Sequence, residues 1–196
     1  MRAGSAVLLA AAALLAGACA KARPPSPAVV SAARTVSTYS AVLSVKLGFR
    51  VRADVIVAFR RPDRLRLEVP GPAGARLLLT TREGRLTAVF PGEHAIFEGA
   101  ASERVLGEVV GVALTPGDVM DFLVGTAPAS VRGYRAEWGP ALPRRLRGRL
   151  PDGTRLDLRV QDPRTEAADD RAFEPPPHDG YRAVDTAEAR ALWTGK

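Results

Sequence analysis

The side chains that could do chemistry are few and scattered in this sequence. The two histidines, His94 and His178, are far apart, and neither belongs to a HExxH or CxxC arrangement that would hold a metal ion. The adjacent carboxylates of Asp169 and Asp170 lie in a polar stretch, without an apolar pocket that would shift a pKa. The chain has no GxSxG elbow and no glycine-rich phosphate loop. We therefore expect that the protein is not an enzyme and has no cofactor and no metal site.

The only cysteine, Cys19, follows a segment with the features of an export signal. Arg2 precedes an apolar run over residues 6–15, and small residues separate the run from the cysteine. In a plain secretory signal this cysteine would be incidental. In a bacterial lipoprotein signal, residues 1–18 are removed and Cys19 carries fatty acids such as palmitate. We favour the lipoprotein signal, although Leu15 lies one position before the usual lipobox leucine.

The composition predicts one basic domain. The 196 residues suit a single folded unit, and the formal net charge of +7 comes almost entirely from arginine. A basic surface attracts anionic lipid head groups or nucleic acid, but a dispersed excess of cations is also typical of a solvated surface. Export and the lack of a basic motif interleaved with aromatic residues argue against nucleic acid. We expect no nucleic-acid partner.

The chain after the signal divides into a tether and a folded part. Residues 19–28 are rich in proline, which predicts a stiffened tether. Residues 29–196 then form one domain. At its start, Ser26 and Pro27 predict a helix that runs to about Ser40.

The domain is organised around a stretch of strict alternation. Every odd position from Leu43 to Phe59 is apolar, and the even positions are mixed. Period two is typical of a sheet with one buried and one wet face. The stretch is too long for one ordinary strand, so we expect a reversal near Arg50. An odd-length loop there keeps the odd positions on the same face.

Two further turns extend this pattern into an antiparallel meander. Residues 61–64 are typical of a turn, and residues 83–84 of a two-residue hairpin loop. A two-residue loop places Leu79 opposite Ala88. The apolar residues switch from odd to even positions at this loop, so turn length and pattern agree.

Helices interrupt the strands in the second half of the chain. A helix is predicted over residues 102–112, with Gly111 near its end. Thr115 and Pro116 predict the start of a second helix that stops at Gly125. Strands are predicted over 94–98 and 131–138, a hairpin over 144–150 and 154–160, and a tail helix over 187–192.

The predicted hairpin has one strongly charged face. Its apolar positions alternate with Asp157 and with arginines at 145, 147, 149, 155 and 159. We interpret this ladder of arginines as a wet sheet face rather than as an anion-binding site.

Several short segments resemble the LolB-type lipoproteins. Residues 62–69, the loop at 70–75 and the leucines at 77–79 are similar to that family's early strands, and residues 105–107 and 119–128 are similar to its central region. The resemblance covers about residues 37–160 in order and spacing. It implies an α+β fold of the LolA/LolB type, in which a half-open antiparallel β-barrel is lidded by helices. In that family the fold encloses a hydrophobic cavity that takes lipoprotein acyl chains.

The resemblance assigns a cavity and a membrane-facing loop to this chain. The cavity residues would be Leu65, Leu67, Leu77, Leu79, Leu86, Ala88, Phe90 and Phe97, most of which fit a packed core equally well. LolB-like proteins present a leucine to the membrane on their loop. The matching position here is Ala73, flanked by Pro72 and Gly74, and alanine brings little apolar area to insert.

Two functions from different classes stay open. The resemblance favours a lipid-anchored receptor that faces the periplasm at the outer membrane of a Gram-negative-type bacterium. Such a receptor accepts acyl chains of lipoproteins or lipids, delivered by a periplasmic LolA-like carrier. The alternative is an envelope assembly or scaffold lipoprotein with a packed core and no lipid cargo. An envelope hydrolase is a third and weaker interpretation, because no residues carry its chemistry.

Overall fold

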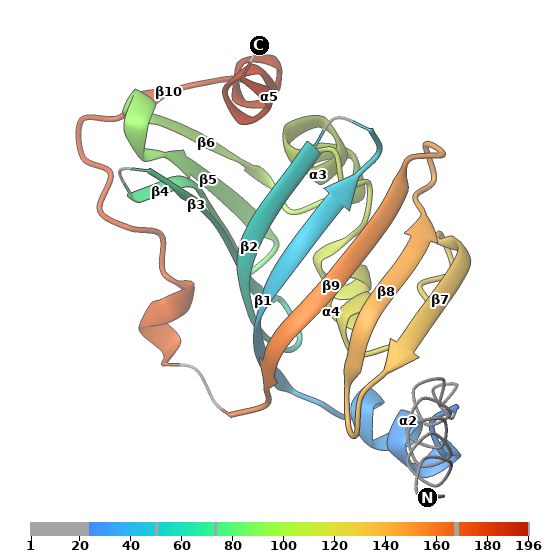
Figure 1. Ribbon diagram of the computed structural model, residues 1–196. Helices are drawn as coiled ribbons and strands as arrows, with labels where there is room; N and C mark the ends of the chain where they lie inside the picture. The colour runs from blue at the N-terminus through green and yellow to red at the C-terminus, as the bar shows by residue number, and fades with distance from the viewer. Residues whose placement is uncertain (1–23, 50, 73, 167–168, 196) are drawn as a thin grey trace, which may run out of the picture.

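The fold is a ten-stranded, curved sheet with helices against its concave face. The computed structural model describes residues 24–49, 51–72, 74–166 and 169–195. The strand order is β10-β6-β5-β4-β3-β2-β1-β9-β8-β7, and every neighbouring pair is antiparallel except β10 with β6. In Figure 1 the strands β3–β6 turn away from the layer formed by β1, β2 and β7–β9, which gives the sheet its hollow side.

The described strands and helices have the following bounds. The strands are β1 (Thr38–Leu47), β2 (Val51–Arg60), β3 (Arg64–Gly71), β4 (Gly74–Arg82), β5 (Arg85–Phe90), β6 (Ala95–Ala100), β7 (Arg132–Trp138), β8 (Pro143–Arg149), β9 (Arg155–Arg164) and β10 (Arg182–Ala183). The helices are α2 (Pro27–Arg34), α3 (Glu103–Val110), α4 (Pro116–Leu123) and α5 (Thr186–Thr194), with 3₁₀ turns η1 (Pro91–Glu93) and η2 (Asp170–Phe173).

The predicted meander and its register are confirmed. The strand β1 ends at Leu47 and β2 begins at Val51, and this odd-length connection sets Leu43 opposite Val55. The two-residue loop between β4 and β5 sets Leu79 opposite Ala88. The register follows from local turn length combined with burial of one face, because a slip by one residue would expose every apolar side chain.

Helix caps also form where the sequence places them. The Ser102 side chain accepts a hydrogen bond from the Val105 amide, and α3 ends at Gly111 with a φ of +79°. Thr115 and Asp118 form a reciprocal capping box at the start of α4. These side chains satisfy backbone N–H groups that a helix end leaves unpaired.

The first helix is shorter than predicted. Ser26 caps α2 as expected, but the helix ends at Arg34 instead of continuing to about Ser40. Thr38 begins β1 and pairs with Arg60 of β2. Strand pairing across the sheet therefore overrides the local helical pattern in this segment.

The helices cover the concave face, as predicted, but the described sheet does not close into a barrel. Its ends are β10 and β7, which lie at opposite ends of the strand order. Apolar residues of α3, α4 and α5, such as Leu106, Phe122 and Trp193, belong to the same core cluster as the concave face. That cluster runs from Ala33 to Trp193, so a chain that starts at Pro24 contains all of it.

The C-terminal segment covers part of the outer face. After β9 the chain passes through η2 and runs along the convex side to β10 (Figure 1). Tyr181 packs on a second apolar cluster formed by Leu78, Val89 and Ile96, which lie on neighbouring strands. Part of the outer face of β4–β6 is therefore buried as well as the inner face, which the alternation pattern alone does not predict.

Candidate functional site: an apolar cavity

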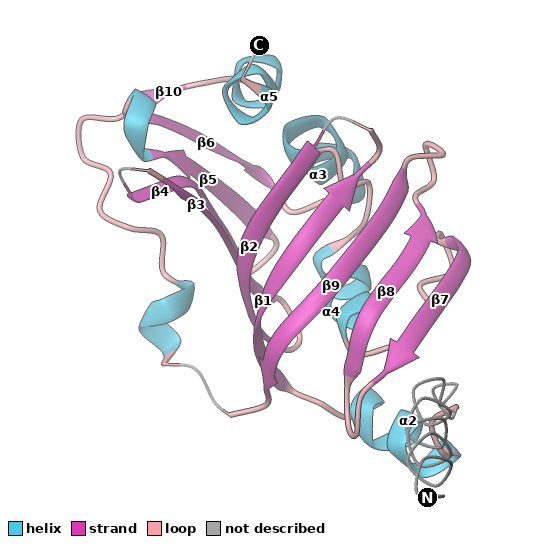
Figure 2. Ribbon diagram, viewed as in Figure 1, coloured by secondary structure: helices cyan, strands magenta, loops and turns pink. Residues whose placement is uncertain are grey.

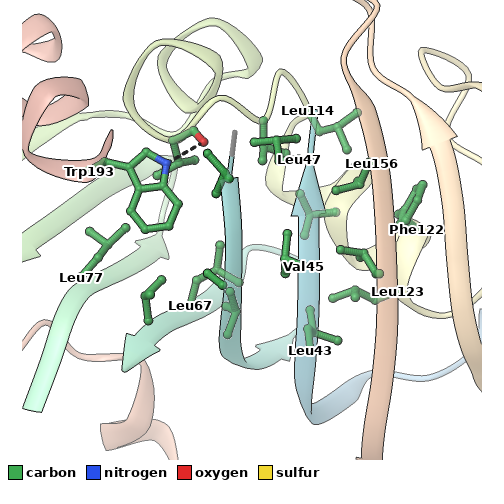
Figure 3. A pocket seen from close by; sticks show the side chains of 18 residues that line it. Leu43, Val45, Leu47, Leu67, Leu77, Leu114, Phe122, Leu123, Leu156 and Trp193 are labelled. Carbon is green, nitrogen blue, oxygen red and sulfur yellow. Dashed lines mark hydrogen bonds between the residues drawn. The ribbon is translucent and has the colours of Figure 1, made fainter. Parts of the chain in front are cut away.

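A cavity of about 100 Å³ lies between the concave face of the sheet and the helices. All 18 side chains that line it are Leu, Val, Ala, Phe or Trp (Figure 3). They are Leu43, Val45, Leu47, Val51, Ala53, Val55, Leu67, Val69, Leu77, Val110, Val112, Leu114, Val119, Phe122, Leu123, Leu156, Leu158 and Trp193. A site of this composition binds apolar groups and offers no chemistry for covalent catalysis.

The strands β1 and β2 supply one wall of the cavity through their alternation. Leu43, Val45 and Leu47 follow one another along β1 on the same face (Figure 3). Val55 and Val51 lie opposite Leu43 and Leu47 in the register and also line the cavity. Side chains that alternate along paired strands necessarily gather on one side of the sheet.

The helical layer supplies the opposite wall. Gly111 adopts the left-handed conformation that ends α3, and the chain then turns so that Val112 and Leu114 line the cavity. From α4, Phe122 and Leu123 face β1 and β9 (Figure 3). The capping box at the start of α4 fixes where this helix begins and so positions its apolar stripe.

Trp193 of α5 lies against one end of the cavity. Its indole Nε1 donates a hydrogen bond to the Val110 carbonyl at 3.1 Å. The guanidinium of Arg76 lies 5.7 Å from the ring centroid and donates to the Trp193 carbonyl at 2.9 Å. The indole N–H is the one polar group among the lining side chains, and because it is already satisfied, the walls leave no side-chain hydrogen-bonding group for a ligand.

A tyrosine packs behind Phe122, which is one of the lining residues. Tyr134 packs edge-on against Phe122, with ring centroids 5.2 Å apart. Burial raises the pKa of the Tyr134 phenol, because the charged form would lose its hydration. The Tyr134 ring therefore backs Phe122 as a neutral side chain.

The residues that the sequence assigned to a cavity fall into two groups. Leu67 and Leu77 line the cavity. The other six are fully buried in the core and do not line it: Leu65, Leu79, Leu86, Ala88, Phe90 and Phe97. The lining residues of β1 and β2 carry the same alternation, so that pattern identified the correct face but not the position of the cavity along it.

The predicted membrane-facing loop is a tight turn between β3 and β4. Pro72 and Gly74 are exposed, and Gly74 has a φ of +118°, which favours glycine. Ala73 lies outside the described residues, as does the predicted lipidation site Cys19. Both assignments stay predictions.

The described residues offer neither a metal site nor a helix that could cross a membrane. They contain no group of three or more His, Cys, Asp or Glu that could hold a metal ion. None of the described helices has the length and apolar character needed to cross a membrane.

Comparison with known proteins gives a similarity of fold. No protein-family model matches the chain, and no curated protein is significantly similar to it. An uncharacterized conserved protein from Thermus thermophilus has a similar structure, with a TM-score of 0.48 and 9% identity over 80% of this chain and 96% of that one. A LolA superfamily protein from Nitrosomonas europaea gives a TM-score of 0.46 and 9% identity over 76% of this chain and 96% of that one.

Proposed function

We propose that this protein is a lipid-anchored lipoprotein that faces the periplasm at the outer membrane and takes acyl chains of lipoproteins or lipids into its cavity. The observation that carries the proposal is a cavity with 18 apolar side chains and no free polar side-chain group. Each methylene moved from water into such a site gains roughly 0.8 kcal/mol. A head group or protein part of the ligand, which needs water or hydrogen bonds, stays outside.

The size of the cavity sets how the ligand enters. A dry apolar cavity of about 150 Å³ is large enough for benzene, so the present cavity of about 100 Å³ encloses a short piece of an acyl chain. A longer chain requires the helical layer to move away from the sheet. Val45, Val51 and Ala53 are lining residues that are only partly buried, and they mark where the space is accessible.

The alternative is a scaffold or assembly lipoprotein with a packed interior and no lipid cargo. Its specific support is the close packing of β4–β6, where Leu79, Leu86 and Ala88 are each 0% exposed. Close packing over half of the concave face leaves less room for cargo than a barrel held open along its length.

Ligand retention distinguishes the two functions. Ala53→Phe fills the cavity, whereas the control Ala58→Phe adds the same ring on the outer face of the same strand. We expect native mass spectrometry of the chain that starts at Pro24 to show bound lipid in the wild type and in Ala58→Phe, but not in Ala53→Phe. If the wild type carries no lipid after purification and after incubation with lysolipid micelles, the result contradicts lipid binding and supports the scaffold function.

The anchor is tested separately in the full-length chain. Cys19→Ala should abolish labelling by a radioactive or clickable palmitate, because no other cysteine can receive the lipid. Ala18→Ser, which keeps a small residue at the predicted cleavage point, is the matched control and should still be labelled. Labelling of Cys19→Ala at the level of the wild type would contradict lipid attachment at Cys19. It would not bear on ligand binding in the cavity.

A carrier partner belongs to the same proposal. We infer that a periplasmic LolA-like carrier delivers the acyl chain, because an exposed chain would lose roughly 0.8 kcal/mol per methylene in the aqueous periplasm. Transfer of a fluorescent lipopeptide from a purified LolA-like carrier to the wild type, but not to Ala53→Phe, would support this step.

A further inference from the structure

The tip of the β1–β2 hairpin exposes a large aromatic ring. Phe49 is 96% exposed, although phenylalanine is usually among the most buried residue types. Its chain neighbours in β1 and β2 include Leu47 and Val51, and both of these line the cavity. An exposed phenylalanine therefore projects from the β1–β2 turn, at the end of the strands beside the cavity.

The outer face next to this tip carries a row of cations. The register aligns Arg52 of β2, Lys46 of β1, Asp157 of β9, Arg147 of β8 and Arg135 of β7 across the sheet. Four of these five side chains are cationic. Arg147 forms ion pairs with carboxylates, whereas Arg52 and Arg135 are exposed and form no ion pair with the described residues.

A second row of cations lies still closer to the strand ends at which the β1–β2 turn projects. It consists of Arg149 on β8, which pairs with Arg155 on β9 and with Arg132 on β7. All three are exposed, and none pairs with a carboxylate in the part of the chain that the structure describes. The Gly48 amide of the hairpin tip donates to the Arg155 carbonyl at 2.8 Å, so this row lies directly beside Phe49.

The excess of cations in these two rows does not continue into the third row from the tip. The next row away from the tip balances Arg145 and Arg159 against Asp54 and Glu137, with Ser44 between them. Like charges directly opposite one another in a sheet destabilise it. The arginines near the tip are therefore arranged against folding stability, which indicates that an anion outside this chain compensates them.

We propose that this edge of the sheet docks on an anionic phospholipid bilayer, with Phe49 in the interface and the two rows of cations on the head-group phosphates. A bilayer fits both parts of the surface, because it offers an apolar layer to the ring and phosphates to the guanidinium groups on the neighbouring strands. A soluble polyanion would match the arginines and leave Phe49 in water. The docked edge would bring the end of the cavity lined by Leu47 and Val51 next to the membrane.

Vesicle flotation of the chain that starts at Pro24 tests the proposal without an anchor. The wild type should float with vesicles that contain phosphatidylglycerol and stay behind with pure phosphatidylcholine, and salt should weaken the binding. Phe49→Ser should lower the partition coefficient about tenfold. Its control is Ile56→Ser, which removes the other exposed large apolar side chain from the outer face of β2 and should leave flotation unchanged.

Charge is tested by a matched pair of double variants. Arg149→Gln with Arg155→Gln should lower binding roughly tenfold or more. Arg85→Gln with Arg144→Gln removes the same charge from exposed positions at the starts of β5 and β8, toward the opposite edge, and should lower binding far less. Thermal melts of Phe49→Ser, Ile56→Ser and the Arg85/Arg144 double variant should stay close to the wild type, since each substituted side chain lies at the surface. The Arg149/Arg155 double variant should melt at the same temperature or higher, because it removes two like charges that lie opposite one another.

Three results would overturn the proposal. The first is that the wild type floats with neither kind of vesicle. If it then binds heparin, the basic face would be assigned to a soluble polyanion. The second is an equal loss for Phe49→Ser and Ile56→Ser. The third is an equal loss for the two double variants. The cavity plays no part in these measurements, so failure here leaves the proposed ligand binding standing.

Discussion

Arginines project from the outer face of both halves of the sheet, and the two halves use them differently. On β2 and β3, Arg60 and Arg64 form ion pairs with Asp170, and Arg66 donates to the Ala172 carbonyl at 3.0 Å. These contacts hold the C-terminal segment over the sheet. On β8 and β9, Arg149 and Arg155 have no carboxylate partner among the described residues. Arginine therefore holds the C-terminal segment in one half and is an exposed charge in the other.

The inner faces differ in a parallel way. Over β4 and β5, Leu79 and Leu86 are completely buried by close packing. Over β1 and β2, Val45 and Ala53 are partly buried and border the cavity. The strands β4 and β5 thus contribute mainly close-packed core, with Leu77 of β4 as the exception that lines the cavity, whereas β1 and the start of β2 supply one wall of the cavity. This division suggests that stability and binding occupy separate regions of one sheet.

The largest expected effect comes from placing a charge in each half. Leu79→Arg buries a guanidinium in the packed half and should lower the free energy of unfolding by about 4 kcal/mol or more. Val45→Arg places its guanidinium in the partly open cavity, where the side chain can extend toward water. Its loss in the free energy of unfolding should be smaller than that of Leu79→Arg by at least about 2 kcal/mol. Urea unfolding of both variants measures the difference. Equal losses would mean that the two inner faces are packed alike.

A medium effect is expected from truncating one apolar side chain on each outer face. Leu78 lies under the C-terminal segment and is 9% exposed, so Leu78→Ala should cost about 2 kcal/mol. Val42 lies on the uncovered outer face of β1, and Val42→Ala should cost less than about 1 kcal/mol. The comparison fails if thermal melts show the two variants to be destabilised to the same extent.

The smallest effect concerns Asp157, a carboxylate that lies among the arginines of β8 and β9. Two hydrogen bonds from Arg145, at 2.9 and 2.7 Å, lower the pKa of Asp157, and burial opposes them only in part. A carboxyl whose pKa is lower in the folded state stabilises the fold above its unfolded pKa of about 4, and this stability is lost as the pH falls through the folded pKa.

Asp157→Asn removes that contribution. The variant should be less stable than the wild type at neutral pH by up to about 1 kcal/mol, and the difference should vanish in acid. Urea unfolding at a series of pH values measures this, and Asp152→Asn in the neighbouring turn is the control. A difference that persists at the acid end would show that shape, and not charge, explains the loss.

The local features of the fold follow from the sequence alone. Alternation from Leu43 to Phe59 and the lengths of the turns determine the register, because both act between residues close in the chain. The caps at Ser102 and Thr115 form for the same reason, since each side chain reaches a backbone N–H three residues away.

What covers each face was decided only by the tertiary structure. Alternation shows that Leu79 and Val45 share a face, but only the positions of α3, α4 and α5 over the curved sheet make one of them core and the other cavity wall. Likewise, the exposed and covered arginines have the same spacing in the sequence. They differ because the C-terminal segment brings Asp170 more than 100 residues along the chain to Arg60 and Arg64, a contact that no local pattern encodes.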